Sequence, residues 1–238
     1  MSIVTIQGNR GSGKDQVAQY LQYILSTPRF LHNYKLAKLL KFKVPFCKWK
    51  IVRYANKLKE MLAILLNVPV ERFEDREFKE NYCFDFDSYQ LCRVDEVAPE
   101  NLVSDKIFSA ELKKGNLYIA RQYCLTIRQI LQFFGTEVMR NLFGDKLWIH
   151  TTLKGYNPPF IISDQRFIVE NEASKHVSFC IHIIRPNCIP SFHSSETELE
   201  NLQRGGKYDV LLHNNGTLKD LFNQCKYIIY EHKNKILP

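Results

Sequence analysis

The octapeptide Gly8-Asn9-Arg10-Gly11-Ser12-Gly13-Lys14-Asp15 constrains the fold of this chain more than any other feature. Its glycines and lysine match the pattern G-x-x-x-x-G-K, in which the backbone turns tightly and directs successive N–H groups at phosphate oxygens. A short apolar strand, residues 3–6, is predicted before it, and apolar residues at helical spacing continue to Leu25. A glycine-rich turn between a strand and a helix predicts a phosphate-binding loop. We therefore assign the whole octapeptide to ATP binding, and Lys14 and Arg10 also to catalysis.

Asp15 is the unusual residue of this loop, because the position after the lysine commonly carries a serine or threonine hydroxyl that binds Mg²⁺. A carboxylate is also a hard oxygen ligand, which Mg²⁺ accepts directly or through water. We predict Asp15 as a metal ligand. A carboxylate here points away from most ATPases with such a loop and toward kinases of small phosphorylated molecules.

Further apolar runs alternate with helical patterns along the chain. Strands are predicted at residues 51–55, 160–162, 179–184 and 210–212, and helices at 56–66, 126–142, after 166 and at 217–230. This alternation predicts an α/β three-layer sandwich around a mainly parallel five-stranded sheet. Residues 70–120 are harder to interpret, with a hairpin expected around Gly115-Asn116, and the basic segment 29–50 is either a loop or a helix. We expect one domain over residues 1–238.

The net charge of +8 favours an anionic partner without identifying it. No two of the seven cysteines are spaced as Cys-x-x-Cys, so we expect reduced thiols rather than zinc or disulfides. The longest apolar runs are too short to span a bilayer, and the first residues lack the pattern of a signal peptide. We expect a soluble cytoplasmic protein without a membrane partner.

Several segments in a fixed order resemble the phage-type deoxynucleoside monophosphate kinases. The octapeptide resembles their G-K-D variant of the phosphate-binding loop, and six more segments follow in the same order: residues 54–59, 75–80, 128–137, 163–166, 184–186 and 214–218. The resemblance leaves out residues 29–50 and 85–120. It implies a nucleotide-binding helical insertion at about residues 56–145 and a lid at about 187–207. Animal-type phosphomevalonate kinase is the nearest alternative, since it shares the G-K-D loop and a Ser-Asp-x-Arg strand end.

Candidate site residues follow the predicted strands. Asp164 ends a buried strand at the edge where open α/β sheets bind ligands, and we predict that it holds Mg²⁺. If a helix begins near Arg166, then Glu170 lies on the same face and fixes the guanidinium or contacts substrate. We assign Asp164 and Arg166 to catalysis and all three residues to substrate binding.

The resemblance implies the remaining assignments. Arg76, Lys79, Arg128 and Gln132 are implied as contacts of the acceptor nucleotide. Arg185, just before the lid, is implied as a catalytic contact of ATP, and Asn215 and Gly216 are implied near the adenine.

The leading hypothesis is a kinase that transfers the γ-phosphoryl group of ATP, with Mg²⁺, to a deoxynucleoside monophosphate. The alternatives are a kinase similar to phosphomevalonate kinase and an ATP-dependent nucleic-acid-binding protein, which only the basic segment 29–50 favours. We expect a small nucleotide as partner rather than nucleic acid, and the sequence leaves a homodimer open. The resemblance also implies a viral origin and action in the host cytoplasm.

Overall fold

The computed structural model describes residues 3–44, 47–93, 106–113, 116–155, 157–186, 188 and 194–237. The chain divides into two compact units. The first unit combines Met1–Lys57 with Leu142–Pro238, and the second is Leu58–Asn141. No helix in the described ranges is long and apolar enough to cross a membrane.

A parallel five-stranded sheet forms the centre of the first unit. Its order is β2 (Lys50–Val52), β6 (Phe160–Gln165), β1 (Ile3–Gly8), β7 (Ser178–Ile184) and β8 (Val210–His213). All four neighbouring pairs are parallel, as the alternating pattern predicts. Because the strands are parallel, their carboxyl ends share one edge, where the predicted site residues begin.

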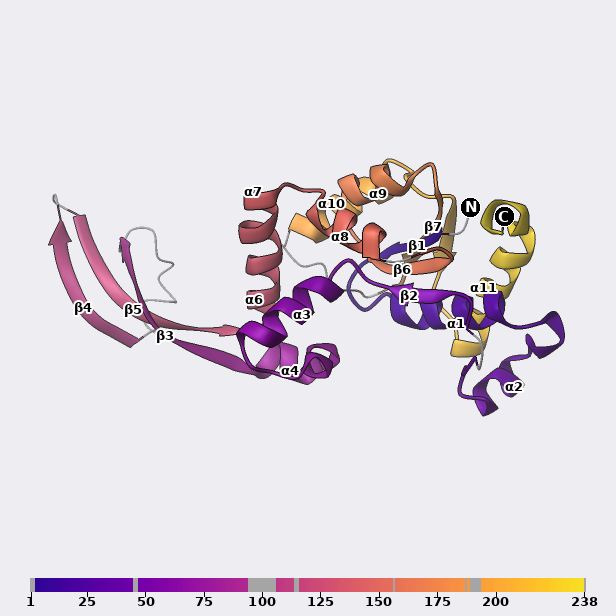
Figure 1. Ribbon diagram of the computed structural model, residues 1–238, viewed down its shortest axis with the longest axis horizontal. Coiled ribbons are helices and arrows are strands. Elements are labelled where there is room, and N and C mark those ends of the chain that lie inside the picture. The colour runs from indigo at the N-terminus through magenta and orange to yellow at the C-terminus, as the bar shows by residue number, and fades with distance from the viewer. Residues whose placement is uncertain are drawn as a thin grey trace. The chain divides into compact units, whose positions relative to one another are not determined.

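Helices lie on both sides of this sheet, which confirms the three-layer sandwich (Figure 1). Helix α1 (Lys14–Ser26) packs against α11 (Leu218–Glu231) on one side, and on the other lie α8 (Leu147–Gly155), α9 (Ile168–Ser174) and α10 (Ser194–Arg204). Short elements complete the unit: η1 (Arg29–Leu31), α2 (Tyr34–Leu39) and α12 (Lys233–Ile236).

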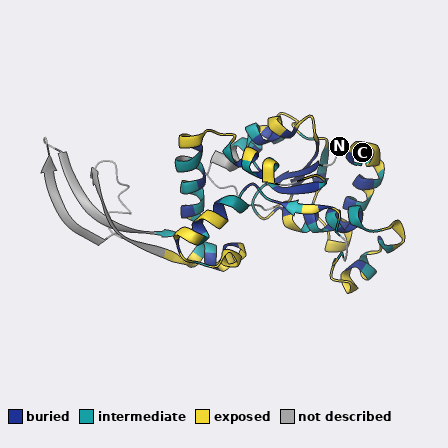
Figure 2. Ribbon diagram, viewed as in Figure 1, coloured by how far each residue is buried: buried dark blue, intermediate teal, exposed yellow. Residues whose placement is uncertain are grey.

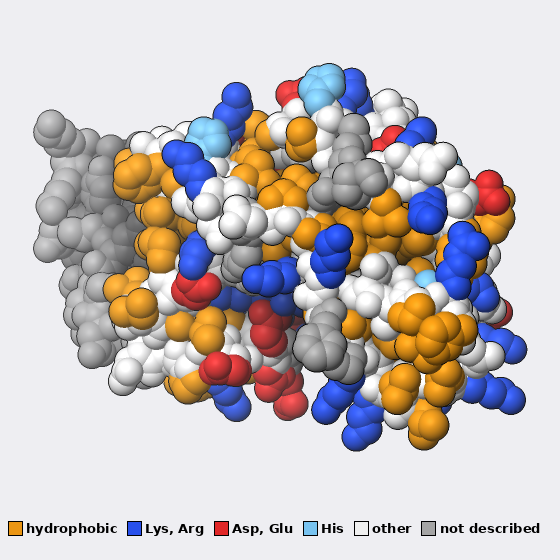
Figure 3. Space-filling view, turned by 45° about the vertical axis from the view of Figure 1, so that its right-hand side comes forward, with side chains coloured by type: hydrophobic (Ala, Val, Ile, Leu, Met, Phe, Trp, Pro, Cys, Tyr) orange, Lys and Arg blue, Asp and Glu red, His pale blue; other side chains and the backbone are white. Residues whose placement is uncertain are grey.

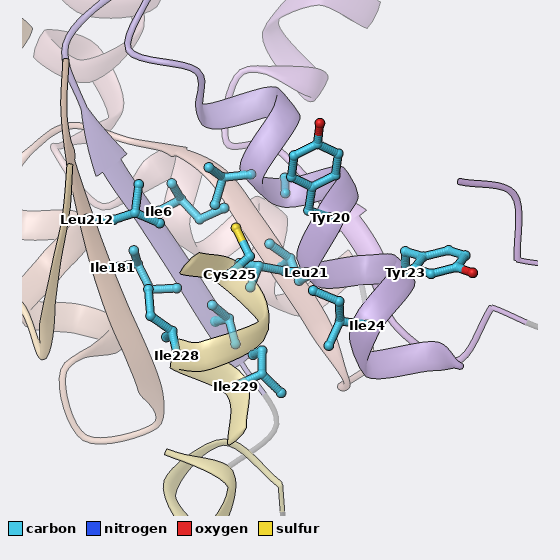
Figure 4. Close-up of a cluster of buried hydrophobic side chains, with 14 of the residues drawn as sticks. Ile6, Tyr20, Leu21, Tyr23, Ile24, Ile181, Leu212, Cys225, Ile228 and Ile229 are labelled. Carbon is cyan, nitrogen blue, oxygen red and sulfur yellow. The ribbon is translucent and has the colours of Figure 1, made fainter. Parts of the chain in front are cut away.

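The apolar core of the first unit lies between the sheet and the pair α1 and α11 (Figures 2 and 4). Ile6 and Ile181 point from the sheet toward Leu21 of α1 and Cys225 of α11, and all four are fully buried. Thr217 caps α11, because its hydroxyl accepts the Asp220 N–H and the Asp220 carboxylate accepts the Thr217 N–H. This packing holds the sheet against the helix that follows the phosphate-binding loop.

The second unit combines short helices with an antiparallel sheet. Its helices are most of α3 (Asn56–Leu65), then η2 (Val70–Glu74), α4 (Arg76–Asn81), α6 (Ile127–Gln132), the π-helix η4 (Phe133–Val138) and the start of α7 (Met139–Phe143). The strands β3 (Cys83–Arg93), β5 (Asn116–Thr126) and β4 (Lys106–Lys113) pair in that order. The expected hairpin is confirmed by the antiparallel pairing of Lys113 with Asn116, while Gly115 lies outside the described residues. The insertion expected to be helical thus also contains a three-stranded sheet, of which only the hairpin was predicted.

One expected strand boundary was wrong, because the second strand ends at Val52 rather than at residue 55. Helix α3 begins at Asn56, as expected, and helix α9 begins at Ile168, so Arg166 precedes it. Of the expected lid, residues 187 and 189–193 lie outside the described residues, and α10 occupies residues 194–204.

Candidate active site

The phosphate-binding loop packs tightly against the neighbouring strand. Gly8 ends β1, and a Cβ atom at that position would lie 2.7 Å from the backbone oxygen of Ile183 and 2.6 Å from the Ser12 hydroxyl. Gly11 and Gly13 have φ of 80° and 99°, in the left-handed region that favours glycine. The loop therefore needs glycine for close approach at one position and for conformation at two others.

Lys14 turns its ammonium group into this loop. Its Nζ donates hydrogen bonds to the backbone oxygens of Gly8 and Asn9, the latter at 2.8 Å, and the residue is only 9% exposed. The Ser12 hydroxyl is buried, with no hydrogen-bond partner within the described ranges. A cradle closed by glycine and centred on a compact cation suits a phosphate group, so these residues fit the predicted nucleotide.

Two side chains from neighbouring strand ends hold the loop. Arg185, after β7, donates from a guanidinium nitrogen to the Gly11 oxygen at 3.0 Å, and Asn214, after β8, donates from Nδ2 to the Ser12 oxygen at 2.8 Å. The sequence prediction included Arg185 but missed Asn214. It selected the next two residues, Asn215 and Gly216, which are exposed. The position of Asn214 directly after the last predicted strand was the available signal.

Asp15 forms an ion pair with a residue that the sequence prediction also missed. Its Oδ1 lies 2.9 Å from a guanidinium nitrogen of Arg53, which follows β2. The Asp15 side chain is 76% exposed and that of Arg53 is 28% exposed. This pair therefore brings the Arg53 guanidinium to the end of the phosphate-binding loop.

Asp164 contacts the same segment through the backbone. Between Thr5 and Gln7 of β1, the partner positions on β6 advance from Ile162 to Gln165, so β6 contains one extra residue. Such a bulge redirects side chains at a strand end. Asp164, in this bulge, accepts the backbone N–H groups of Tyr54 at 2.8 Å and Ala55 at 3.0 Å.

Both predicted metal-binding carboxylates, Asp15 and Asp164, therefore contact residues 53–55. In the described parts of the chain, no group of three or more His, Cys, Asp or Glu residues could hold a metal ion. Mg²⁺ in phosphoryl-transfer sites commonly uses one or two carboxylates together with the phosphates of the substrate. The two aspartates offer this donor chemistry.

Glu170 organises the start of α9. Its Oε2 accepts the backbone N–H of Arg166 at 2.8 Å and of Phe167 at 3.1 Å, and the residue is 2% exposed. We expected the carboxylate to meet the Arg166 guanidinium on one helical face. Helix α9 begins at Ile168, so Arg166 precedes the helix, and Glu170 accepts its backbone N–H.

A buried polar network lies directly behind the loop, on the sheet face opposite the apolar core. Gln7 donates from Nε2 to the Gln165 side chain at 3.1 Å, and Nδ1 of His182 lies 3.2 Å from Gln7 Oε1. Burial, with a smaller contribution from the positive charge of Lys14, lowers the pKa of His182 to about 4. The imidazole is therefore neutral at pH 7, and the network links the ends of β1, β6 and β7.

The predicted acceptor residues belong to the second unit. Arg128, at the start of α6, pairs through Nε with the Glu80 carboxylate at 2.5 Å, and both side chains are less than one-third exposed. Lys79 donates to the backbone oxygen of Glu74 at 3.4 Å, Arg76 is exposed, and Gln132 is half-buried. The unit thus presents cationic side chains from α4 and α6, two helices that pack together.

The parallel sheet and the glycine-rich loop at the end of β1 define the class of P-loop kinase-like α/β proteins. A model of the deoxynucleotide monophosphate kinase family matches residues 2–225, so the chain belongs to that family. A protein of Acanthamoeba polyphaga mimivirus, named "Putative deoxynucleotide monophosphate kinase", is 30% identical over 121 residues. That match covers 44% of this chain and 61% of the viral protein, so the chain spans less than two thirds of this relative.

Proposed function

We propose that the protein transfers the γ-phosphoryl group of ATP to a deoxynucleoside monophosphate, giving the deoxynucleoside diphosphate and ADP. The observation that carries this proposal is the Lys14 ammonium group held within a glycine loop, in a chain that matches the family over residues 2–225. The same match favours this function over the phosphomevalonate kinase alternative.

On the ATP side, the loop supplies backbone N–H groups and two kinds of cation. Lys14 is a compact cation for the β- and γ-phosphates, and Arg185, already fixed on the Gly11 oxygen, can offer further guanidinium N–H groups to phosphate oxygens. We assign Arg53 to the same phosphates, because its guanidinium pairs with Asp15 in the first turn of α1. Charge neutralisation and positioning are the main contributions that a protein makes to phosphoryl transfer.

Asp15 and Asp164 would hold Mg²⁺ directly or through water. When bound, Mg²⁺ offsets the charge that develops on the phosphate oxygens. The role of residues 53–55 is to fix the two carboxylates: Arg53 contacts one, and the backbone of Tyr54 and Ala55 contacts the other.

On the acceptor side, the attacking group is an oxygen of a phosphate monoester. Its second pKa lies near 6, so it is already ionised at pH 7, and no general base is required. Arg76, Lys79 and Arg128 would offset its charge, and Glu80 would orient Arg128 through their ion pair. Gln132, one turn after Arg128, is our candidate for contact with a base edge.

A coupled assay of ADP release over the four deoxynucleoside monophosphates tests this function. We expect activity with at least one of them, and none with phosphomevalonate or in the absence of Mg²⁺. Lys14→Met is expected to abolish turnover, whereas Lys175→Met, which changes an exposed lysine after α9, is not. Circular dichroism of both variants separates lost chemistry from lost folding. Absence of activity with all four nucleotides would contradict the proposal.

The cellular setting is part of the same proposal. The family match supports a small nucleotide as partner, and the mimivirus relative supports a viral origin with action in the host cytoplasm. For the alternative of ATP-dependent nucleic-acid binding, the distinguishing result is ATP hydrolysis that DNA stimulates without any nucleotide acceptor.

A further inference from the structure

The described residues of the basic segment, 29–44 and 47–50, form a platform on the first unit. Tyr34 and Phe42 turn inward, with ring centroids 5.7 and 6.0 Å from that of Phe222, and the Phe42 ring lies 4.9 Å from Tyr20. Ala37 of α2, which lies between these two residues in the sequence, is fully buried. These contacts fix which side chains of the segment face outward.

The outward side exposes large apolar groups. Phe30 is 79% exposed, Leu39 78% and Leu40 43%. The helix α2 that carries Leu39 has its N-terminus capped by Asn33, so this exposure belongs to an ordered element. A cluster of exposed apolar side chains on an ordered surface commonly marks an interaction site.

Lysines accompany these apolar groups. Between residues 29 and 50 there is no acidic residue, and six exposed lysines occur: Lys35, Lys38, Lys41, Lys43, Lys48 and Lys50. Within the described ranges, no ion pair joins any of the six to a carboxylate. Figure 3 shows hydrophobic side chains at the lower right of the molecule, with Lys and Arg side chains around their edge.

We propose that this platform docks on the surface of a bilayer that contains anionic lipids. Lysine is depleted in protein–protein interfaces, whereas the positive charge of lysine side chains is enough to attract them to anionic lipid headgroups. Apolar tips beside lysines suit the boundary between headgroups and acyl chains, and phosphates of nucleic acid offer no match for exposed leucines. The α2 helix has six residues, so the contact is interfacial.

This inference is independent of the proposed kinase activity and differs from the expectation of no membrane partner. Lysines near an anionic surface each strengthen binding by a factor of about five. Reversing the charge of two of them is therefore expected to weaken vesicle binding by at least an order of magnitude.

Sedimentation of the full chain with lipid vesicles tests the proposal. We expect binding to equimolar phosphatidylcholine and phosphatidylserine, weakened by high salt, and no binding to phosphatidylcholine alone. The variants Leu39→Ser and Lys35→Glu/Lys38→Glu should lose binding to the mixed vesicles. Matched controls are Ile64→Ser, an 84% exposed position on α3, and Lys175→Glu, and both should bind as the wild type does. Thermal unfolding verifies that each variant is folded.

Each other outcome overturns the proposal. Absence of binding to the mixed vesicles does so directly, and binding that the platform variants retain assigns the contact to another surface. Salt-sensitive binding to an oligonucleotide, without vesicle binding, assigns the lysines to nucleic acid. Self-association that Leu39→Ser abolishes, again without vesicle binding, assigns the platform to a second copy of the chain. Phe30→Ser provides an independent variant if Leu39→Ser fails to fold.

Discussion

Replacing Asp164 by asparagine tests how much the strand end depends on its carboxylate. The two oxygens of Asp164 each accept one backbone N–H, from Tyr54 at 2.8 Å and from Ala55 at 3.0 Å. Asparagine keeps one carbonyl oxygen, but its NH₂ group must face the second N–H. The substitution therefore removes one charge-assisted hydrogen bond, weakens the other and places two donors against each other.

The magnitude follows from these contacts. A hydrogen bond to a charged group contributes about 1.5–3 kcal/mol, and a buried donor without a partner costs about 1–3 kcal/mol. Because Asp164 is half-buried, we take the lower part of this range and expect the free energy of unfolding to fall by about 2 kcal/mol. For a chain of this size the melting temperature would decrease by about 4–8 °C.

Urea unfolding and thermal melting measure this change, with Asp209→Asn as the control. The Asp209 carboxylate accepts one backbone N–H, from Cys180 at 2.8 Å, which an asparagine oxygen can still accept. We expect a loss under about 1 kcal/mol there. An Asp164→Asn protein that unfolds within about 0.5 kcal/mol of the wild type would refute the hydrogen-bond reasoning. If Asp164 also binds Mg²⁺, Asp164→Asn requires more Mg²⁺ for half-maximal activity, whereas Asp209→Asn does not.

Three further tests concern the loop and its surroundings. The pKa of His182 is lowered to about 4 in the folded protein, whereas an unperturbed histidine has a pKa of about 6.5. Between these two pH values the unfolded chain therefore binds more protons than the folded protein does. The resulting stability is complete above about pH 6.5 and falls by about 2 kcal/mol at pH 5. In urea unfolding, His182→Gln should not show this loss of stability between about pH 6.5 and pH 5. An equal loss in the wild type and in His182→Gln would contradict the assignment to His182. Gly8 and Gly11 both have a positive φ that strains alanine, but only at Gly8 would the added Cβ also meet a backbone atom, the Ile183 oxygen. Gly8→Ala should therefore weaken ATP binding more than Gly11→Ala, and equal affinities by calorimetry would argue against this packing. Arg53→Met should raise KM for ATP, while the ion pair that it removes, with the exposed Asp15, contributes less than about 1 kcal/mol to stability. An unchanged KM would remove Arg53 from the phosphate site.

The features predicted well from sequence are local ones. The strand, glycine turn and helix around Gly8 and Lys14 follow one another directly, so pattern and spacing sufficed. The parallel sheet followed from apolar runs with the same clarity. The closing helix was also predicted, at residues 217–230, because its pattern of apolar residues is local.

The missed features depend on long-range contacts. Asp164 meets the backbone of Tyr54, 110 residues earlier, and Asp15 meets Arg53, 38 residues later. No local pattern marks such partners. The antiparallel sheet of the second unit, apart from its hairpin, was missed for a related reason: β3 pairs with β5, which is not its neighbour in the sequence.

The polar sheet face behind the loop has an evolutionary consequence. Gln7 joins Gln165 and His182, and further bonds run from Gln7 to the Lys207 oxygen and from Gln165 to the Ser174 hydroxyl. Replacing one of the three alone therefore removes a buried hydrogen bond, and where a group loses its last partner the cost is about 1–3 kcal/mol. Relatives can therefore reach other combinations mainly through linked changes. In an alignment of the family these three columns are expected to covary, whereas Ile6 and Ile181, on the apolar face, can exchange for other aliphatic residues one at a time.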